Sequence, residues 1–107
     1  ANLAGEAWAV SNMSIAYNLM GKQWQASRHA DRALKLAIRS GDIPAIARTN
    51  YRQALVIFRQ EKSDKALPFA QQARQLYERL KDQEMLDKTD RLLAAIEKRR
   101  KKTGIFS

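Results

Sequence analysis

Apolar residues recur along the chain at steps of three and four, the spacing that brings them to one face of an α-helix. The first such stretch carries Val10, Met13 and Tyr17 before it stops at Gly21. No stretch shows the strict alternation of a half-buried strand, so the pattern predicts an all-α fold. The predicted helices cover about residues 4–20, 24–39, 43–60 and 83–102, and a fourth helix follows a cap at Ser63 or Asp64 and runs to about residue 80.

Short polar turns separate the predicted helices. In Ser40-Gly41-Asp42, the glycine tolerates a left-handed closing residue, and the aspartate can accept backbone N–H bonds of the next helix. Pro44 falls just inside that helix start, where its missing N–H costs nothing. Pro68 lies further into its helix, which is therefore expected either to start late or to bend. Turns of a few residues make consecutive helices antiparallel neighbours.

Small residues recur forty positions apart. Superposing residues 12–37 on 52–77 brings four identical pairs of apolar residues into register. These pairs are Ala26 with Ala66, Ala30 with Ala70, Ala33 with Ala73, and Leu36 with Leu76. Small side chains at this period let paired helices approach closely. Two helices in a unit of about forty residues are typical of helical solenoids.

Tyr17, Gly21, Ala26 and Ala33 resemble the tetratricopeptide (TPR) pattern, in which an aromatic residue is followed by glycine and two alanines at these spacings. In the second unit Glu61 replaces the glycine. The period resembles the longer, roughly forty-residue variants of this family. The resemblance implies antiparallel helix pairs stacked as a right-handed superhelical solenoid in a single domain. It would comprise a first repeat at about 5–40, a second at about 43–81 and a capping helix at about 83–102, within residues 1–107.

The chain is basic, with 20 Lys and Arg against 11 Asp and Glu, which favours acidic partners. The excess is +3 in each of residues 1–41, 42–82 and 83–107, so there is no separate basic tail domain. The sequence has no cysteine, no secretory signal pattern and no apolar run near the ~20 residues of a membrane span. These features predict a cytoplasmic protein.

In TPR proteins the first helices of successive repeats line a concave groove that holds a peptide or a partner helix. Carried over by position, this groove would contain an asparagine, a tryptophan and several basic residues. The predicted binding residues are Trp8, Asn12, Arg48, Arg52, Arg59, Arg91 and Lys98, with Ile15, Leu19 and Lys88 beside them. Arginine and asparagine suit carboxylates, so we expect an acidic peptide as ligand. The alternative is that the arginines form only a solvated surface.

The carboxylate clamp known in the TPR family matches this sequence in part. Asn12 corresponds to one of its positions, whereas Tyr51 and Leu55 occupy two places where the clamp has other residues, and a basic group would have to come from Arg91. The resemblance therefore implies peptide binding without specifying chaperone tails.

Nothing in the sequence indicates catalysis. His29 is the sole histidine and has no second imidazole, cysteine or paired carboxylate beside it. There is no phosphate-binding glycine loop and no nucleophile elbow, so we expect no enzyme activity, no metal and no cofactor.

Two other functions stay open at this stage. Lys98-Arg99-Arg100-Lys101-Lys102 is the one concentrated basic run, and it could contact nucleic acid phosphates. Cations are also favoured at a helix C-terminus for electrostatic reasons alone. The chain could instead act as a spacer, or associate with itself through open helix ends.

Overall fold

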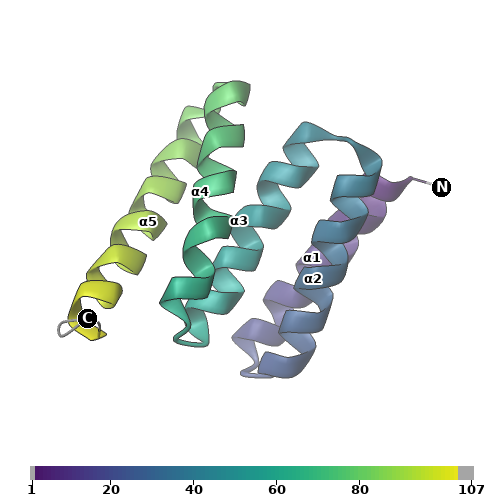
Figure 1. Ribbon diagram of the computed structural model, residues 1–107. Coiled ribbons are helices and arrows are strands. Elements are labelled where there is room, and N and C mark those ends of the chain that lie inside the picture. The colour runs from purple at the N-terminus through teal and green to yellow at the C-terminus, as the bar shows by residue number, and fades with distance from the viewer. Residues whose placement is uncertain (1, 104–107) are drawn as a thin grey trace.

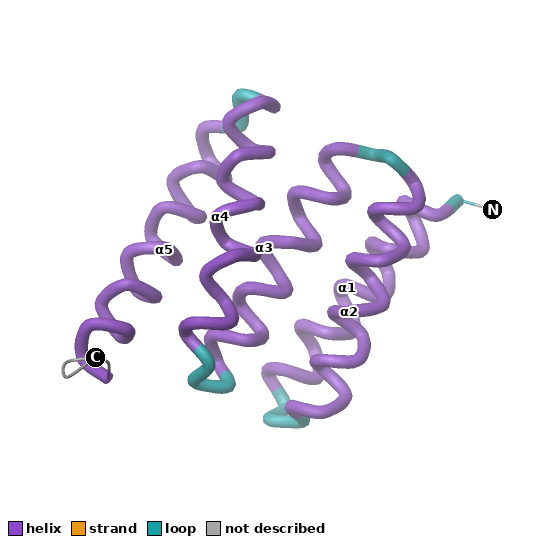
Figure 2. The backbone as a smooth tube through the Cα atoms, in the orientation of Figure 1, coloured by secondary structure: helices purple, strands orange, loops and turns teal. Residues whose placement is uncertain are grey.

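The computed structural model describes residues 2–103 and places them in five helices joined by short turns (Figures 1 and 2). The prediction of an all-α fold is confirmed for this part of the chain, and each predicted helix boundary lies within two residues of the observed one. The helices are α1 (Leu3–Leu19), α2 (Gln23–Ser40), α3 (Ile43–Arg59), α4 (Ser63–Leu80) and α5 (Gln83–Thr103). Across the described residues, no helix combines the length and the hydropathy that a bilayer span requires.

The helices begin at a constant interval, at Leu3, Gln23, Ile43, Ser63 and Gln83. Within this series α1, α3 and α5 have the same type of N-terminal cap. The side chains of Asn2, Asp42 and Asp82 each accept a hydrogen bond from the backbone N–H three residues later, at 2.9, 3.2 and 3.1 Å. Such a cap satisfies one of the unpaired donors of the first turn. The forty-residue period is therefore visible in the local structure as well as in the alanine pattern.

The four turns share one backbone feature. Gly21, Gly41, Glu61 and Lys81 recur at the same interval as the helix starts, and all have positive φ angles between 56° and 76°. This left-handed conformation closes a helix and is most easily adopted by glycine. Glu61 therefore replaces the glycine in sequence while keeping its backbone conformation.

Pro68 lies inside α4, which begins at Ser63. The alternative that this helix starts late is therefore wrong. Pro68 sits in the second turn on the exposed side of the helix, where its ring faces solvent. Only the hydrogen bond to the carbonyl four residues back, that of Asp64, is lost.

Consecutive helices pack against each other as antiparallel neighbours, and α3 also contacts α1 and α5. Among the described residues, α2 and α4 make no contact. Figure 1 shows the resulting row, with α1 and α5 at opposite ends and α2 in front of α1. The molecule measures 49 × 33 × 20 Å, and the shortest dimension fits two layers of helices about 10 Å thick. The five helices thus form an extended row of sequential pairs.

Alanines form much of the buried surface between the helices. Residues 26–40 of α2 and 66–80 of α4 show the same sequence of buried, partly buried and exposed positions, although only five of these fifteen residue pairs are identical. The shared buried positions include the pairs Ala26 and Ala66, and Ala33 and Ala73. Small side chains at these points allow close helix contact, as the sequence predicts.

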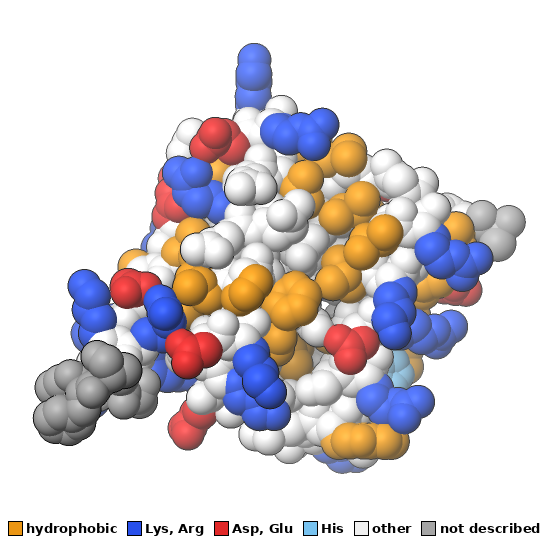
Figure 3. Space-filling model, viewed as in Figure 1, with side chains coloured by type: hydrophobic (Ala, Val, Ile, Leu, Met, Phe, Trp, Pro, Cys, Tyr) orange, Lys and Arg blue, Asp and Glu red, His pale blue; other side chains and the backbone are white. Residues whose placement is uncertain are grey.

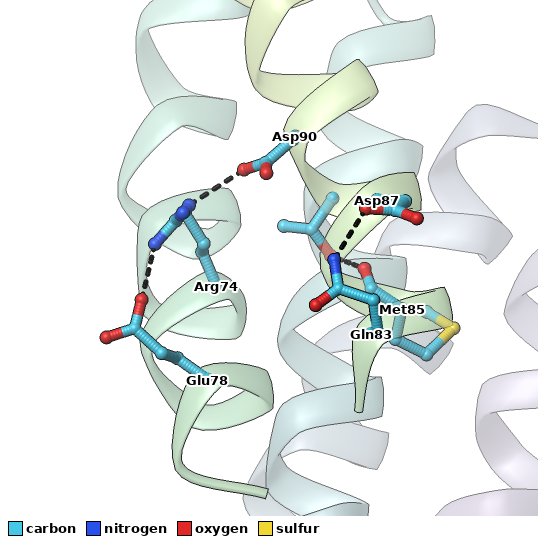
Figure 4. Close-up of polar contacts among 7 residues, drawn as sticks. Arg74, Glu78, Gln83, Met85, Asp87 and Asp90 are labelled. Carbon is cyan, nitrogen blue, oxygen red and sulfur yellow. Dashed lines mark hydrogen bonds and ion pairs between the residues drawn. The ribbon is translucent and has the colours of Figure 1, made fainter. Parts of the chain in front are cut away.

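Polar contacts add to the apolar packing at the edges of the pairs. Arg74 of α4 donates from Nε to Asp90 of α5 at 2.7 Å and from Nη1 to Glu78 at 2.8 Å (Figure 4). Between α2 and α3, the Gln53 amide donates to Asp31 at 2.6 Å. Because the Arg74 contacts are exposed, they contribute little to stability and chiefly select the orientation of the helices.

Candidate functional site

We call α1, α3 and α5 the leading helices, because α1 and α3 each begin a helix pair and α5 follows the second pair. A groove of about 630 Å³ crosses these three helices and reaches the C-terminal end of α4. Trp8, Arg48 and Lys88 line it at equivalent positions, forty apart in sequence, on the three helices. The remaining lining residues are Pro44, Tyr51, Arg52, Tyr77, Leu80, Asp82 and Met85. We call this surface the Arg–Trp groove.

Two arginines of α3 stack on the tryptophan of α1. The guanidinium carbon of Arg48 lies 4.2 Å from the centre of the Trp8 ring, and that of Arg52 lies 4.9 Å from it. Arg52 also donates to the Asn12 side-chain oxygen at 2.6 Å and to the Ser11 hydroxyl at 3.2 Å. Cation–π contact and these hydrogen bonds fix the direction of both guanidinium groups. The structure thus brings together four of the predicted binding residues.

The two guanidinium groups have no acidic partner. Among the described residues, no ion pair joins Arg48 or Arg52 to a carboxylate, and Nε of Arg48 is buried without a hydrogen-bond partner. Burial lowers the pKa of Arg52, and the neighbouring charge of Arg48 lowers it further. Two like charges held close together in a half-buried groove attract an anion strongly, because solvent screens them poorly.

Two tyrosines that were not predicted as binding residues complete the wall next to the arginines. Tyr77 of α4 is almost fully buried, and this burial raises the pKa of its phenol to about 12. Tyr51 of α3 is half-buried and lies close enough to Tyr77 to contribute to the rise in its pKa. Both side chains supply apolar surface and a hydroxyl group to the wall, and the raised pKa keeps Tyr77 from adding negative charge beside the arginines.

The other three predicted binding residues lie outside this groove. Arg59, Arg91 and Lys98 are exposed and do not line it. On α5, Arg91 and Lys98 occupy the positions that Tyr51 and Phe58 have on α3, which pack into an apolar cluster. The forty-residue offset from Trp8 and Arg48 leads instead to Lys88, which the carry-over from TPR proteins also placed in the groove and which the structure shows lining it.

The basic run at the end of α5 is partly engaged within the molecule. Arg99 stacks on the Phe58 ring at 3.7 Å and donates to the Phe58 carbonyl. Arg100 pairs with Asp64 at 2.8 Å and with Glu97 at 3.0 Å. Lys98, Lys101 and Lys102 are exposed. Two of the five cations therefore help to hold α5 against α3 and α4.

His29 and Trp24 lie away from the groove on α2. The His29 ring packs 5.0 Å from Tyr17, and its Nδ1 donates to the Gln25 carbonyl at 2.7 Å. Trp24 is largely exposed and stacks with Arg28 at 4.9 Å. Figure 3 shows this side of the molecule, where basic side chains follow the edges and apolar side chains gather between α2 and α4.

Comparison of the chain with protein-family models, curated proteins and solved structures found no match.

Proposed function

We propose that this protein is an interaction module that binds an acidic segment of a partner protein in the Arg–Trp groove. The observation that carries this proposal is the pair of guanidinium groups on Trp8. Arg48 and Arg52 are held by the ring and, for Arg52, by Asn12, while neither has a carboxylate partner in the described residues. A ligand carboxylate would supply the missing charge and could accept two parallel hydrogen bonds from one guanidinium group.

The surroundings of the arginines favour a peptide over a small inorganic anion. Met85, Leu80 and Tyr51 give the groove apolar walls that suit the side chains flanking an acidic residue. Lys88 lies at the α5 end of the groove and offers a second cationic position. A groove that extends over three helices suits an extended segment or a partner helix.

We also propose that the helix row is a TPR-like solenoid with α5 as its cap. The forty-residue period of helix starts, caps and left-handed turn residues supports this architecture. It is further supported by the contacts of α3 with α1 and α5, since stacked repeats bring their leading helices together. In such an array the leading helices line the binding surface, which is where the Arg–Trp groove lies.

The proposal can be tested with Trp8 as a fluorescent reporter. A Trp24→Phe variant leaves Trp8 as the one tryptophan of the chain, and it is titrated with peptides rich in Asp and Glu. We expect Arg48→Glu and Arg52→Glu to weaken binding roughly tenfold or more, because each places a negative charge at the ligand carboxylate. Arg32→Glu is the matched control, because Arg32 is an exposed arginine of α2 outside the groove, and it should bind almost as well as the parent.

The nucleic-acid alternative gives a different result in the same assay. Replacing Lys98, Lys101 and Lys102 with glutamine should leave peptide binding intact, since these residues lie outside the groove. If that variant loses ligand while Arg52→Glu retains it, the groove is not the site. If DNA or RNA binds through the basic run, the logarithm of its binding constant should fall linearly with the logarithm of the salt concentration, whatever the base sequence.

A further inference from the structure

α1 has an exposed face without charge. The helix contains a single charged residue, Glu6, and its apolar residues lie all around it. Ala9, Met13, Ala16 and the C-cap Met20 follow one another at steps of four, three and four, so they share one side of the helix. All four are exposed, with 44% of Met13 and 62% of Met20 accessible to solvent. We call these four residues the α1 face.

The equivalent positions on the two later leading helices are covered. One forty-residue period leads from the α1 face to a face of α3, and a second period leads to a face of α5. These positions are Thr49, Gln53, Val56 and Gln60 on α3, and Thr89, Leu93, Ile96 and Arg100 on α5. Every one of them is buried or partly buried. On α3 and α5, each of which follows a helix pair, this side of the helix is therefore used for packing.

The contacts of these equivalent residues identify their packing partner. On α3, Gln53 bonds to Asp31 and Gln60 bonds to Ser27, and both partners belong to α2. On α5, Arg100 pairs with Asp64 of α4. This side of each leading helix thus joins it to the preceding pair. The α1 face is the one copy of this surface that lacks a partner within residues 2–103.

The opposite end of the row is built differently. On α3, Ala47, Tyr51, Ala54 and Phe58 pack into the apolar clusters shared with α4 and α5. The equivalent residues of α5 are Asp87, Arg91, Ala94 and Lys98, and all are exposed. The α5 end therefore presents charges to solvent, whereas the α1 end presents alanine and methionine. An apolar face opposite a charged one marks an interaction surface.

We propose that the α1 face binds the α1 face of a second copy of this chain, antiparallel and around a two-fold axis. The order small, large, small, large along the face is complementary to itself in this arrangement. With the axis between residues 14 and 15, Met13 faces Ala16 of the second copy, and Ala9 faces Met20 of the second copy. Each methionine then fills the space over an alanine, as good helix packing requires.

Charges close to the interface favour this pairing, whereas the net charge of each chain opposes it. The same axis places Glu6 opposite residue 23 of the second copy, so the one acid of α1 meets the turn that contains Lys22. Each chain carries a net charge of +9, so two copies repel at long range. Salt screens this repulsion, and we expect dimerisation to strengthen as salt is added. Acidic-peptide binding in the Arg–Trp groove should weaken under the same change.

Sedimentation equilibrium tests the association. The chain has a mass of 12.2 kDa, and we expect twice this mass to appear between about 10 μM and 1 mM, the range in which small interfaces associate. Met13→Glu should remain monomeric throughout, although it lowers the net charge and so weakens the general repulsion. Ile38→Glu also replaces an exposed apolar side chain with glutamate, but on α2, and should dimerise like the parent. Circular dichroism confirms that both variants are folded.

Disulfide formation tests the orientation, because the natural chain has no cysteine. Met13→Cys and Ala16→Cys proteins are mixed and oxidised slowly. The antiparallel arrangement predicts that mixed dimers exceed the one half of all dimers that random pairing of equal amounts would give, since residue 13 of one chain faces residue 16 of the other. A monomeric parent protein at every concentration would overturn the proposal. A statistical mixture of disulfides, or equal dimerisation by the Met13→Glu and Ile38→Glu variants, would also overturn it.

Discussion

Tyr77 is the residue of the Arg–Trp groove whose ionisation is most strongly tied to folding. Burial raises its pKa from about 10 to about 12, so the folded protein holds the neutral phenol. A raised pKa contributes stability that is complete below about pH 10 and is lost as the pH rises through about 12. Because a pKa difference of one corresponds to ~1.4 kcal/mol, the loss is at most about 3 kcal/mol.

The measurement compares the free energy of unfolding of the parent and a Tyr77→Phe variant between about pH 9 and 12. Phenylalanine fills the same volume and cannot ionise, so the stability of the parent should fall relative to the variant only above about pH 10. Every other ionisable group is common to the two proteins, so the comparison isolates Tyr77. Parallel curves for the two proteins would show that Tyr77 ionises as freely when folded as when unfolded.

Among individual residues, sequence reasoning identified the charged part of the groove better than its walls. The resemblance to TPR proteins predicts Trp8, Asn12, Arg48 and Arg52 on one surface, and the structure brings them together. Tyr77 could not be found in this way, because it belongs to α4 and reaches the groove only through the packing of that helix against α3. Only the three-dimensional arrangement reveals such a contribution.

Among the elements, the turns between helices offer the clearest prediction. Glu61 has a φ of 61°, the conformation that Gly21 adopts at the equivalent turn with a φ of 76°. A side chain beyond glycine is strained there, by roughly 1 kcal/mol, because Cβ approaches the backbone. We expect Glu61→Gly to stabilise the protein by about 0.5–1 kcal/mol after the greater flexibility of the unfolded chain is included.

Thermal or urea unfolding measures this gain. Glu61→Ala is the control, because it removes the same charge and keeps Cβ, so it should give no gain. Gly21→Ala is the reverse experiment and should destabilise by about 1 kcal/mol. A gain of equal size for the alanine and glycine variants at position 61 would mean that charge, and not backbone conformation, limits the turn.

The helices themselves were predictable because local signals coincide at each boundary. Asp42 caps α3 while Gly41 closes α2, so one short turn specifies both ends. Pro68 was harder to interpret, because the sequence alone does not show which side of α4 faces solvent. In the structure it lies on the exposed side, and the alanines opposite it pack against α3 and outweigh the missing hydrogen bond.

Over the full length of the protein, the row of helices divides the core into separate parts. One apolar cluster contains Val10 and joins α1, α2 and the first turn of α3, and another contains Ile96 and joins α3, α4 and α5. Val56 of α3 packs with Ala26 and Ala30 of α2 and links the two ends. The forty-residue period predicted antiparallel helix pairs, and the structure shows the helices packed in sequential pairs, but the sequence did not predict the division of the core. The direction of superhelical twist was predicted from the family resemblance alone and stays a prediction.

A divided core predicts that the two ends of the molecule can loosen separately. Ile96 is fully buried at the α5 end, and Ile96→Ala should cost about 3 kcal/mol through lost contacts and a residual cavity. Val10 is buried at the α1 end, and Val10→Ala removes two methyl groups at a cost of about 2 kcal/mol.

If each helix is stabilised mainly by the helices next to it, Ile96→Ala reduces amide-exchange protection most in α4 and α5, and Val10→Ala reduces it most in α1 and α2. A single cooperative core would instead lose protection equally in all five helices with either variant. Hydrogen exchange followed by mass spectrometry, on both variants under identical conditions, separates these outcomes because each variant serves as the control for the end it leaves intact.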